Sequence, residues 1–153
     1  MFKFSFTGIP QMIKTMNAIS AAVDREVAIE AKKIGKNAEY ELKKELSHPG
    51  TGIRYKATKS GKYHVASAPG QPPATDLGTL KRSTHAEVSR VEGENMVSIS
   101  AGSELAFYAK LLEEGTANIA PRPFFFVTLK RNMEKWFGWW KNAVARGLTR
   151  GGA

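Results

Sequence analysis

The chain has 153 residues, enough for one ordinary domain and too few for two. Hydrophobic residues make up 42% of it and charged residues 24%, which is the composition of a folded protein and not of a disordered one. It contains no cysteine, which excludes disulfides, iron–sulfur clusters and a thiol nucleophile. No apolar run approaches the roughly 20 residues of a membrane helix, so we expect neither a membrane span nor a signal peptide.

The formal net charge is +9, and it is unevenly distributed along the chain. Residues 1–46 carry a net +2, residues 47–83 a net +5, residues 84–120 a net −4 and residues 121–153 a net +6. One explanation is that surface charges cluster by chance. The other is self-association, in which the acidic segment of one copy lies beside a basic segment of the next.

The chain begins with a predicted strand and a long predicted helix. Phe2, Phe4 and Phe6 alternate with polar residues, which is the period of a half-buried strand. From Pro10 to Leu46, apolar residues recur at steps of three and four, which predicts one amphipathic helix. Such a helix is about 55 Å long, longer than a domain of this size covers. Either it bends at Gly35 or part of its apolar stripe packs on another subunit, and we favour the second.

Residues 47–79 are rich in proline and glycine, which excludes a helix or a central strand. Residues 71–74 read Gln-Pro-Pro-Ala, which favours an extended, polyproline-like arm. We therefore predict an extended basic loop or arm over 47–79. The alternative is an insertion without a role of its own.

The second half of the chain alternates short elements with one long helix. Residues 80–91 and 96–100 alternate as the two strands of a β-hairpin, with a turn at 93–95. Residues 104–113 predict a short helix capped by Gly115. A second long helix begins at Pro123, runs to about Ala145 and is stopped by Gly147, which leaves 147–153 as a flexible tail. The predicted fold class is α+β: one domain (1–153) whose N-terminal and C-terminal helices pack on a small antiparallel sheet.

The sequence shows no catalytic constellation, so we expect no enzymatic activity, cofactor or metal. The three histidines, His48, His64 and His85, are not paired. Glu113 and Glu114 are adjacent on a helix and point to different faces, so they cannot share a substrate. No glycine-rich loop with the lysine of a phosphate-binding motif is present. Of the functions considered, the sequence therefore supports that of a small hydrolase least.

Two groups of residues favour interaction surfaces. In the basic loop, cations interleave with Tyr55 and Tyr63, a pattern that suits sequence-independent contact with nucleic acid. Three tryptophans crowd onto 136–140, and successive helical residues differ by about 100°. At least one of them is therefore expected to meet a neighbouring chain, unless the N-terminal helix covers all three. The candidate DNA-facing residues are Arg54, Lys56, Lys59 and Lys62.

Two strings resemble those of a known family. Residues 69–80 read PGQPPATDLGTL, and residues 108–124 read YAKLLEEGTANIAPRPF. Their order and spacing are similar to those of the tail-component family of long-tailed bacteriophages, the neck or tail-completion proteins. That family has a Pro-Gly-x-Pro-Pro run leading to Asp-Thr-Gly-x-Leu, and a Tyr-Ala-x-x-Leu-Glu-x-Gly-Thr run leading to Arg-Pro-Phe. Leu77 here replaces the usual threonine. The resemblance spans about residues 47–130.

The resemblance implies a structural virion protein without enzymatic activity, made in the host cytoplasm and located at the head–tail neck. It implies a homo-oligomeric ring, with six copies as the expected number, and contacts with the head connector or stopper and with the tail terminator or tail tube proteins. Phage DNA or the tape-measure protein would pass the basic loop in the channel. A tail terminator that caps the tube is the closest alternative, and a monomeric nucleic-acid-binding module is the second. The residues expected at subunit contacts are Pro72, Pro73, Asp76, Glu113, Glu114, Arg122, Phe124, Trp136, Trp139 and Trp140.

Overall fold

The computed structural model of the chain describes residues 9–56, 61 and 63–152. The strand expected at Phe2, Phe4 and Phe6 and the candidate DNA contacts Lys59 and Lys62 lie outside these residues. The helices are α1 (Ile9–Glu45), α2 (Thr79–Arg82), the 3-10 turn η1 (Glu104–Ala106), α3 (Ala109–Glu114) and α4 (Phe125–Gly151). The strands are β1 (Arg54–Lys56), β2 (Tyr63–Val65), β3 (His85–Val91) and β4 (Glu94–Ser100).

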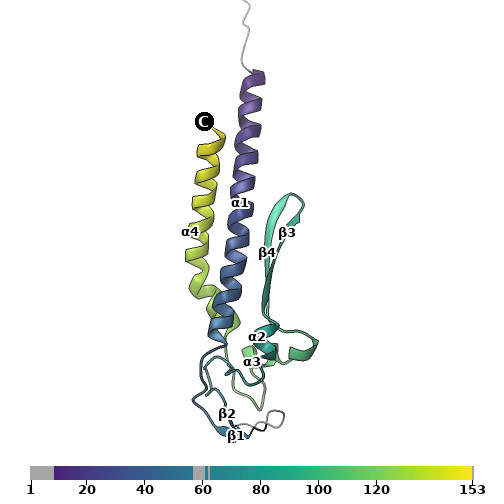
Figure 1. Cartoon of the computed structure of the whole chain (residues 1–153), viewed down its shortest axis with the longest axis vertical. Helices are drawn as coiled ribbons and strands as arrows, with labels where there is room; N and C mark the ends of the chain where they lie inside the picture. Colours follow the sequence, from purple (N-terminus) through teal and green to yellow (C-terminus); the bar gives the residue numbers. More distant parts are fainter. Residues whose placement is uncertain (1–8, 57–60, 62, 153) are drawn as a thin grey trace, which may run out of the picture.

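The fold is α+β, as predicted, and it is elongated along the two long helices (Figure 1). α4 runs antiparallel along one side of α1, and the β3–β4 hairpin lies along the other side. The short helices and the β1–β2 hairpin gather at the end of the molecule where α1 ends. The C-terminal helix was expected to pack on the sheet. In the structure, α4 packs on α1 instead.

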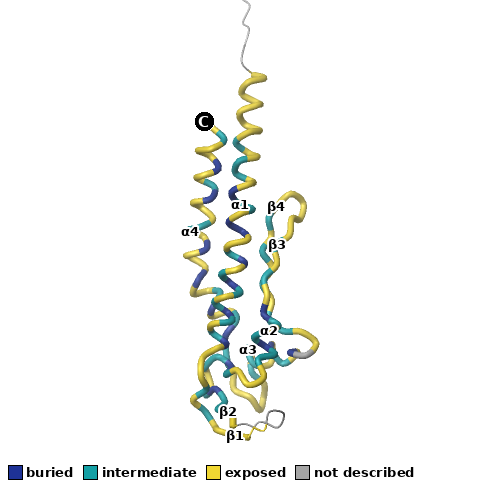
Figure 2. Tube along the Cα trace, viewed as in Figure 1, coloured by how far each residue is buried: buried dark blue, intermediate teal, exposed yellow. Residues whose placement is uncertain are grey.

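α1 confirms the predicted long helix and decides one of its two alternatives. It runs without interruption through Gly35, whose Cα faces the hairpin side chains of Ala86, Val88 and Val97. Gly35 therefore does not interrupt the helix, which argues against the less favoured of the two alternatives. The first turns of α1 extend beyond the end of α4 and are exposed (Figure 2). Their apolar side chains, Ile9, Met12, Ile13 and Met16, are 51–61% exposed.

The predicted hairpin is present, with a shorter first strand than expected. β3 and β4 pair from His85↔Ser100 to Val91↔Glu94, and the two turn residues, Glu92 and Gly93, both have positive φ. This is the geometry that a two-residue hairpin loop requires. The strand expected to start at residue 80 begins only at His85, because residues 79–82 form the helical turn α2.

The C-terminal segment corrects a second prediction. α4 does not stop at Gly147; it continues to Gly151, so most of the tail expected at 147–153 is helical. A Cβ atom on Gly147 would lie 2.4 Å from Val23 Cα, and one on Gly151 would lie 2.4 Å from Ile19 Cα. These two glycines thus let the backbones of α1 and α4 approach closely, and this packing outweighs the low helix propensity of glycine.

The seam between α1 and α4 is closed by ion pairs. Arg146 donates to Glu26 Oε2 at 3.0 Å and to Glu30 Oε2 at 2.7 Å, and Arg150 also pairs with Glu26. Both carboxylates are buried. The hydrogen bond from Arg146 lowers the pKa of Glu26 below its ordinary value of 4.5. Burial alone would raise the pKa of Glu30, but the bonds from Lys33 and Arg146 outweigh it and lower that pKa too.

Replacing Arg146 by glutamine is expected to make stability less dependent on carboxylate ionisation. Because the folded-state pKa values of Glu26 and Glu30 are depressed, their contribution is present above the ordinary pKa of 4.5 and is lost as pH falls through the depressed values. The difference in unfolding free energy between wild type and R146Q should therefore be largest near neutral pH and shrink in acid. Denaturant unfolding at a series of pH values measures this.

Arg90→Gln is the matched control for that experiment. Arg90 pairs with Asp24 at 3.1 Å, but both side chains are more than half exposed. An exposed pair contributes less than about 1 kcal/mol, so R90Q should leave the unfolding curves nearly unchanged. Equal pH profiles for R146Q and wild type would contradict a role for the buried pairs.

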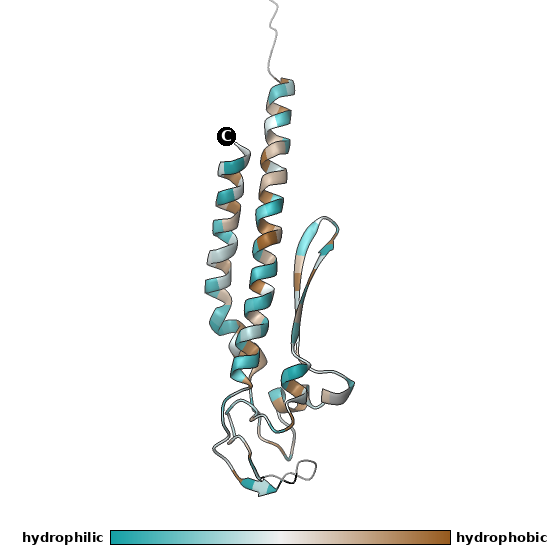
Figure 3. Ribbon diagram, viewed as in Figure 1, coloured by the Kyte–Doolittle hydropathy of each residue, from teal (hydrophilic) through white to brown (hydrophobic). Residues whose placement is uncertain are grey.

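The main hydrophobic core lies at the junction of the helices and the short elements. Apolar residues along α1 and α4 alternate with polar ones (Figure 3), and only part of them reach this core. No helix in the described part of the chain has the length and apolarity that a membrane span needs. The buried core residues are Leu42, Leu46, Leu80, Ala106, Ala109 and Phe124.

Candidate interaction surfaces

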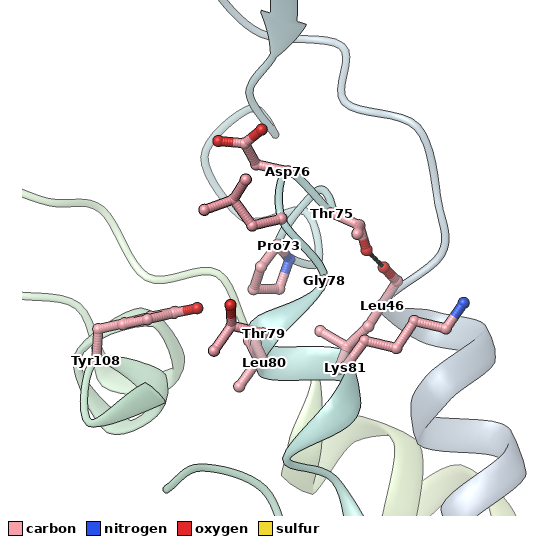
Figure 4. A pocket seen from close by; sticks show the side chains of 10 residues that line it. Leu46, Pro73, Thr75, Asp76, Gly78, Thr79, Leu80, Lys81 and Tyr108 are labelled. Atoms are coloured by element: carbon pink, nitrogen blue, oxygen red, sulfur yellow. Dashed lines mark hydrogen bonds between the residues drawn. The ribbon is translucent and has the colours of Figure 1, made fainter. Parts of the chain in front are cut away.

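The first family-like string, residues 69–80, builds a pocket wall at the end of α1 (Figure 4). The Thr75 hydroxyl donates to the Leu46 carbonyl, and Arg82 donates to the Leu77 carbonyl at 2.8 Å. Gly78 has φ 74°, a positive φ that glycine adopts without strain. The pocket, of about 210 Å³, opens between this turn and Tyr108.

Asp76 does not brace the turn in which it lies. An aspartate in a turn commonly accepts hydrogen bonds from nearby backbone N–H groups, but within the described ranges no such bond to Asp76 is formed. The side chain is exposed, and Figure 4 shows it at the rim of the pocket, turned away from Tyr108 and Lys81. Asp76 is therefore still accessible to a partner.

The second string, residues 108–124, is held together by Glu113. Its carboxylate accepts hydrogen bonds from the backbone N–H groups of Phe124, Phe125 and Phe126 at 2.7, 2.9 and 3.1 Å. These N–H groups open α4 and have no partner within the helix, and the helix dipole favours a negative charge there. Glu113 thus caps α4 within its own chain, and its expected contact with another subunit stays a prediction.

Glu113→Ala is expected to lower the free energy of unfolding by about 1–2 kcal/mol, because it removes the cap of α4. Glu114→Ala is the control at the next position. Glu114 is exposed and lies 3.9 Å from Lys110, so its loss should change stability by less than about 0.5 kcal/mol. Thermal unfolding followed by circular dichroism compares the two. Equal effects would argue against the capping role.

Other residues expected at subunit contacts also have partners within the chain. The Arg122 guanidinium donates to the Ser67 carbonyl at 3.2 Å, and the Arg122 N–H donates to the Leu112 carbonyl at 2.7 Å. Phe124 is only 1% exposed and belongs to the core, and Pro73 is buried. Buried side chains leave no surface for a second subunit, so the prediction for Phe124 and Pro73 is wrong. Pro72 is half-buried.

The basic loop carries an exposed hairpin at one end of the molecule (Figure 1). Arg54 and Lys56 lie on β1 and are exposed, and the Arg54 guanidinium sits 4.5 Å from the centre of the Tyr63 ring. Gly52 N–H donates to the Ala66 carbonyl at 2.7 Å, so the segment folds back on itself beyond the strands. The strands β1 and β2 thus combine exposed cations with accessible aromatic rings, a combination that suits contact with nucleic acid.

The three tryptophans divide between core and surface. Trp136 is buried, and its indole N–H donates to Asn37 Oδ1 at 2.8 Å, so the prediction that it contacts a neighbouring subunit is wrong. Trp139 is half-buried beside Lys33, whose Nζ lies 4.2 Å from the ring centre. Trp140 is 43% exposed and stacks on Phe137, with ring centres 6.0 Å apart. α1 therefore does not cover all three, and Trp140 is accessible to a partner.

Trp140 belongs to a longer apolar stripe that the sequence did not single out. Five apolar side chains of α4, spread over six turns, are 43–66% exposed. Their phase differs from that of Trp136, Ala143 and Gly147, which face α1, and this difference is the signal that a helical projection would have given. We call these residues the α4 stripe: Phe126, Met133, Phe137, Trp140 and Leu148.

The cations of α4 separate into two groups. Arg131, Lys135, Arg146 and Arg150 form ion pairs with glutamates of α1. Lys130 and Lys141 form no ion pair in the part of the chain that the structure describes, and Lys141 Nζ lies 5.2 Å from the centre of the Phe137 ring. The basic charge that remains free on α4 is therefore concentrated beside the α4 stripe.

The described residues hold no group of three or more histidine, aspartate or glutamate side chains arranged to bind a metal ion. A comparison with protein-family models, with curated proteins and with solved structures finds no match for this chain.

Proposed function

We propose that the chain is a structural subunit of the phage head–tail neck, a tail-completion protein that forms a ring joining the tail to the head connector. The observation that carries this proposal is the α4 stripe, whose large apolar side chains stand exposed along one helix. Large apolar side chains exposed together along one helix face are typical of protein–protein contact sites. The two strings that resemble the tail-component family supply the identity of the assembly.

The ring also suggests a role for the basic β1–β2 hairpin. If the β1–β2 hairpin of each subunit faces the ring axis, one copy of Arg54 and Lys56 per subunit gathers there and forms a strongly basic collar. We propose that this collar contacts DNA or the end of the tape-measure protein in the channel. The proposal makes no use of enzymatic chemistry, and it needs no cofactor.

The test is an assembly complementation. Lysate from an infection in which this gene is deleted should contain filled heads and complete tails that are not joined. Adding the purified protein should restore joined virions and infectivity, and a matched sample of heat-denatured protein should not. Joined virions in the deletion lysate without added protein would contradict the proposal. Capped tails of normal length before addition would separate it from the tail-terminator alternative, which predicts tails of irregular length.

The exposed β1–β2 hairpin favours one other function for the chain, that of a sequence-independent nucleic-acid-binding module. That candidate predicts a monomer whose affinity for DNA falls steeply with salt. Arg54→Ala combined with Lys56→Ala should then abolish DNA binding by the isolated protein. A neck subunit predicts weak DNA binding by the monomer.

A further inference from the structure

The β3–β4 hairpin has a second face that the described chain does not cover. Side chains alternate along both strands, and those of Ala86, Val88, Val97 and Ile99 turn toward the body of the molecule. The others are exposed. A two-stranded sheet is marginally stable on its own, and here α1 supports the inner face of both strands and leaves the outer face open. The exposed outer residues, which we call the hairpin face, are His85, Glu87, Ser89, Val91, Glu94, Met96, Ser98 and Ser100.

The hairpin face is acidic, with two apolar side chains near the turn. Ser89 pairs with Met96 and Val91 pairs with Glu94, so Met96 and Val91 are close neighbours on it. Both are nearly half exposed. Glu87 and Glu94 flank them, and Glu92 adds a third carboxylate at the turn. The nearest basic group of the hairpin, Arg90, is already paired with Asp24.

The α4 stripe is the complement of this face. It presents large apolar rings, with the ammonium groups of Lys130 and Lys141 beside them. The α4 stripe and the hairpin face both run parallel to the long axis, and α4 and the hairpin lie on opposite sides of α1 (Figure 1). One copy can therefore use both surfaces at once, each with a different neighbour.

We propose that the hairpin face of one copy packs on the α4 stripe of the next copy, with Glu87 and Glu94 beside Lys130 and Lys141. Such a contact is heterologous, and a repeated heterologous contact gives a ring when its rotation closes and an open filament when it does not. The inference rests on the proposed function for the existence of a ring. Beyond the ring itself, two specific surfaces are assigned to each other. In this contact, α4 of the next copy covers the hairpin face.

Single cysteines test the contact, because the chain has none of its own. Met96→Cys places a thiol on the hairpin face, and Phe137→Cys places one in the middle of the α4 stripe. With a short bis-maleimide cross-linker and tail tubes present, a mixture of M96C and F137C proteins should give dimers, and each variant alone should give none. A chain with both cysteines should give a ladder. Ser20→Cys, on an exposed part of α1, is the control for random collision.

Each other outcome contradicts the inference in a defined way. Dimers of F137C alone would mean that two α4 stripes meet, and dimers of M96C alone that two hairpins meet. Oligomers by mass without a cross-link in the mixture would place the ring contact elsewhere and leave the neck proposal standing. A monomer that also fails the assembly complementation would remove both.

Charge reversal gives an independent readout that needs no thiols. Lys141→Glu and Glu87→Lys should each weaken self-association about tenfold, with the far-UV circular dichroism unchanged. An equimolar mixture of the two variants should recover most of it, because every contact in an alternating ring is again between opposite charges. Lys36→Glu, an exposed position on α1 away from both surfaces, should have no effect. Failure of the mixture to recover association would overturn the pairing.

Discussion

Replacing Phe124 by alanine is expected to lower the free energy of unfolding by about 3–5 kcal/mol. Phe124 is 1% exposed and packs in the cluster that contains Leu42, Leu46 and Leu80. Its loss removes a large buried ring and leaves a cavity where α1, α2 and α4 meet. Denaturant unfolding followed by tryptophan fluorescence measures the change.

Phe107→Ala is the matched control for this substitution. Phe107 is 75% exposed, so the same chemical change should cost less than about 1 kcal/mol. The pair also separates the two roles considered for Phe124. A subunit-contact residue would weaken assembly and leave the isolated chain stable, and a core residue destabilises the chain itself. An F124A protein as stable as wild type would contradict the packing described above.

Replacing Gly147 by alanine is expected to destabilise the protein by about 1–3 kcal/mol, although alanine is the better helix former. The added Cβ atom would lie 2.4 Å from Val23 Cα and 2.8 Å from Val23 N. Backbone atoms cannot move aside as a flexible side chain does, so α1 and α4 must separate. Separation also lengthens the bonds from Arg146 to Glu26 and Glu30.

Gly138→Ala makes the same change in the same helix where space is open. No heavy atom of the described structure lies within 4 Å of a Cβ at Gly138. There the gain in helix propensity is unopposed, and stability should rise by about 0.5–1 kcal/mol. The two glycine substitutions are thus expected to have opposite signs. Thermal melts of G147A and G138A side by side measure this, and a rise for both would contradict the close helix contact.

The elements with a local signal were predictable from the sequence. The three-and-four spacing from Met12 to Leu46 gave α1 nearly to its observed ends, because a single face of a helix is recorded in its own residues. The alternation at 85–100 gave the hairpin for the same reason. The predicted end of α4 at Gly147 was wrong. A glycine that ends a helix and a glycine that lets a neighbouring helix pack closely cannot be told apart in a single sequence.

The roles of the candidate site residues also depend on contacts with residues distant in sequence, which the sequence does not reveal. Glu113 and Phe124 were conspicuous in the family-like string, but their partners are backbone N–H groups and core residues distant in sequence. The basic charge of 121–153 was read as free for another subunit. Most of it pairs with glutamates of α1, where each step of four along α4 matches a step of four back along α1. Only the helix pairing reveals that Lys130 and Lys141 are the cations left over.

The most direct test of the central claim is the mass of the purified protein, measured by light scattering at micromolar concentration, alone and mixed with tail tubes. A structural neck subunit predicts a closed oligomer of the 16.8 kDa chain, with six copies expected, or a monomer that becomes such an oligomer on the tube end. Self-association should be about tenfold weaker in the Lys141→Glu variant and unchanged in Lys36→Glu. A protein that remains a monomer in both conditions and never sediments with tubes would contradict the account.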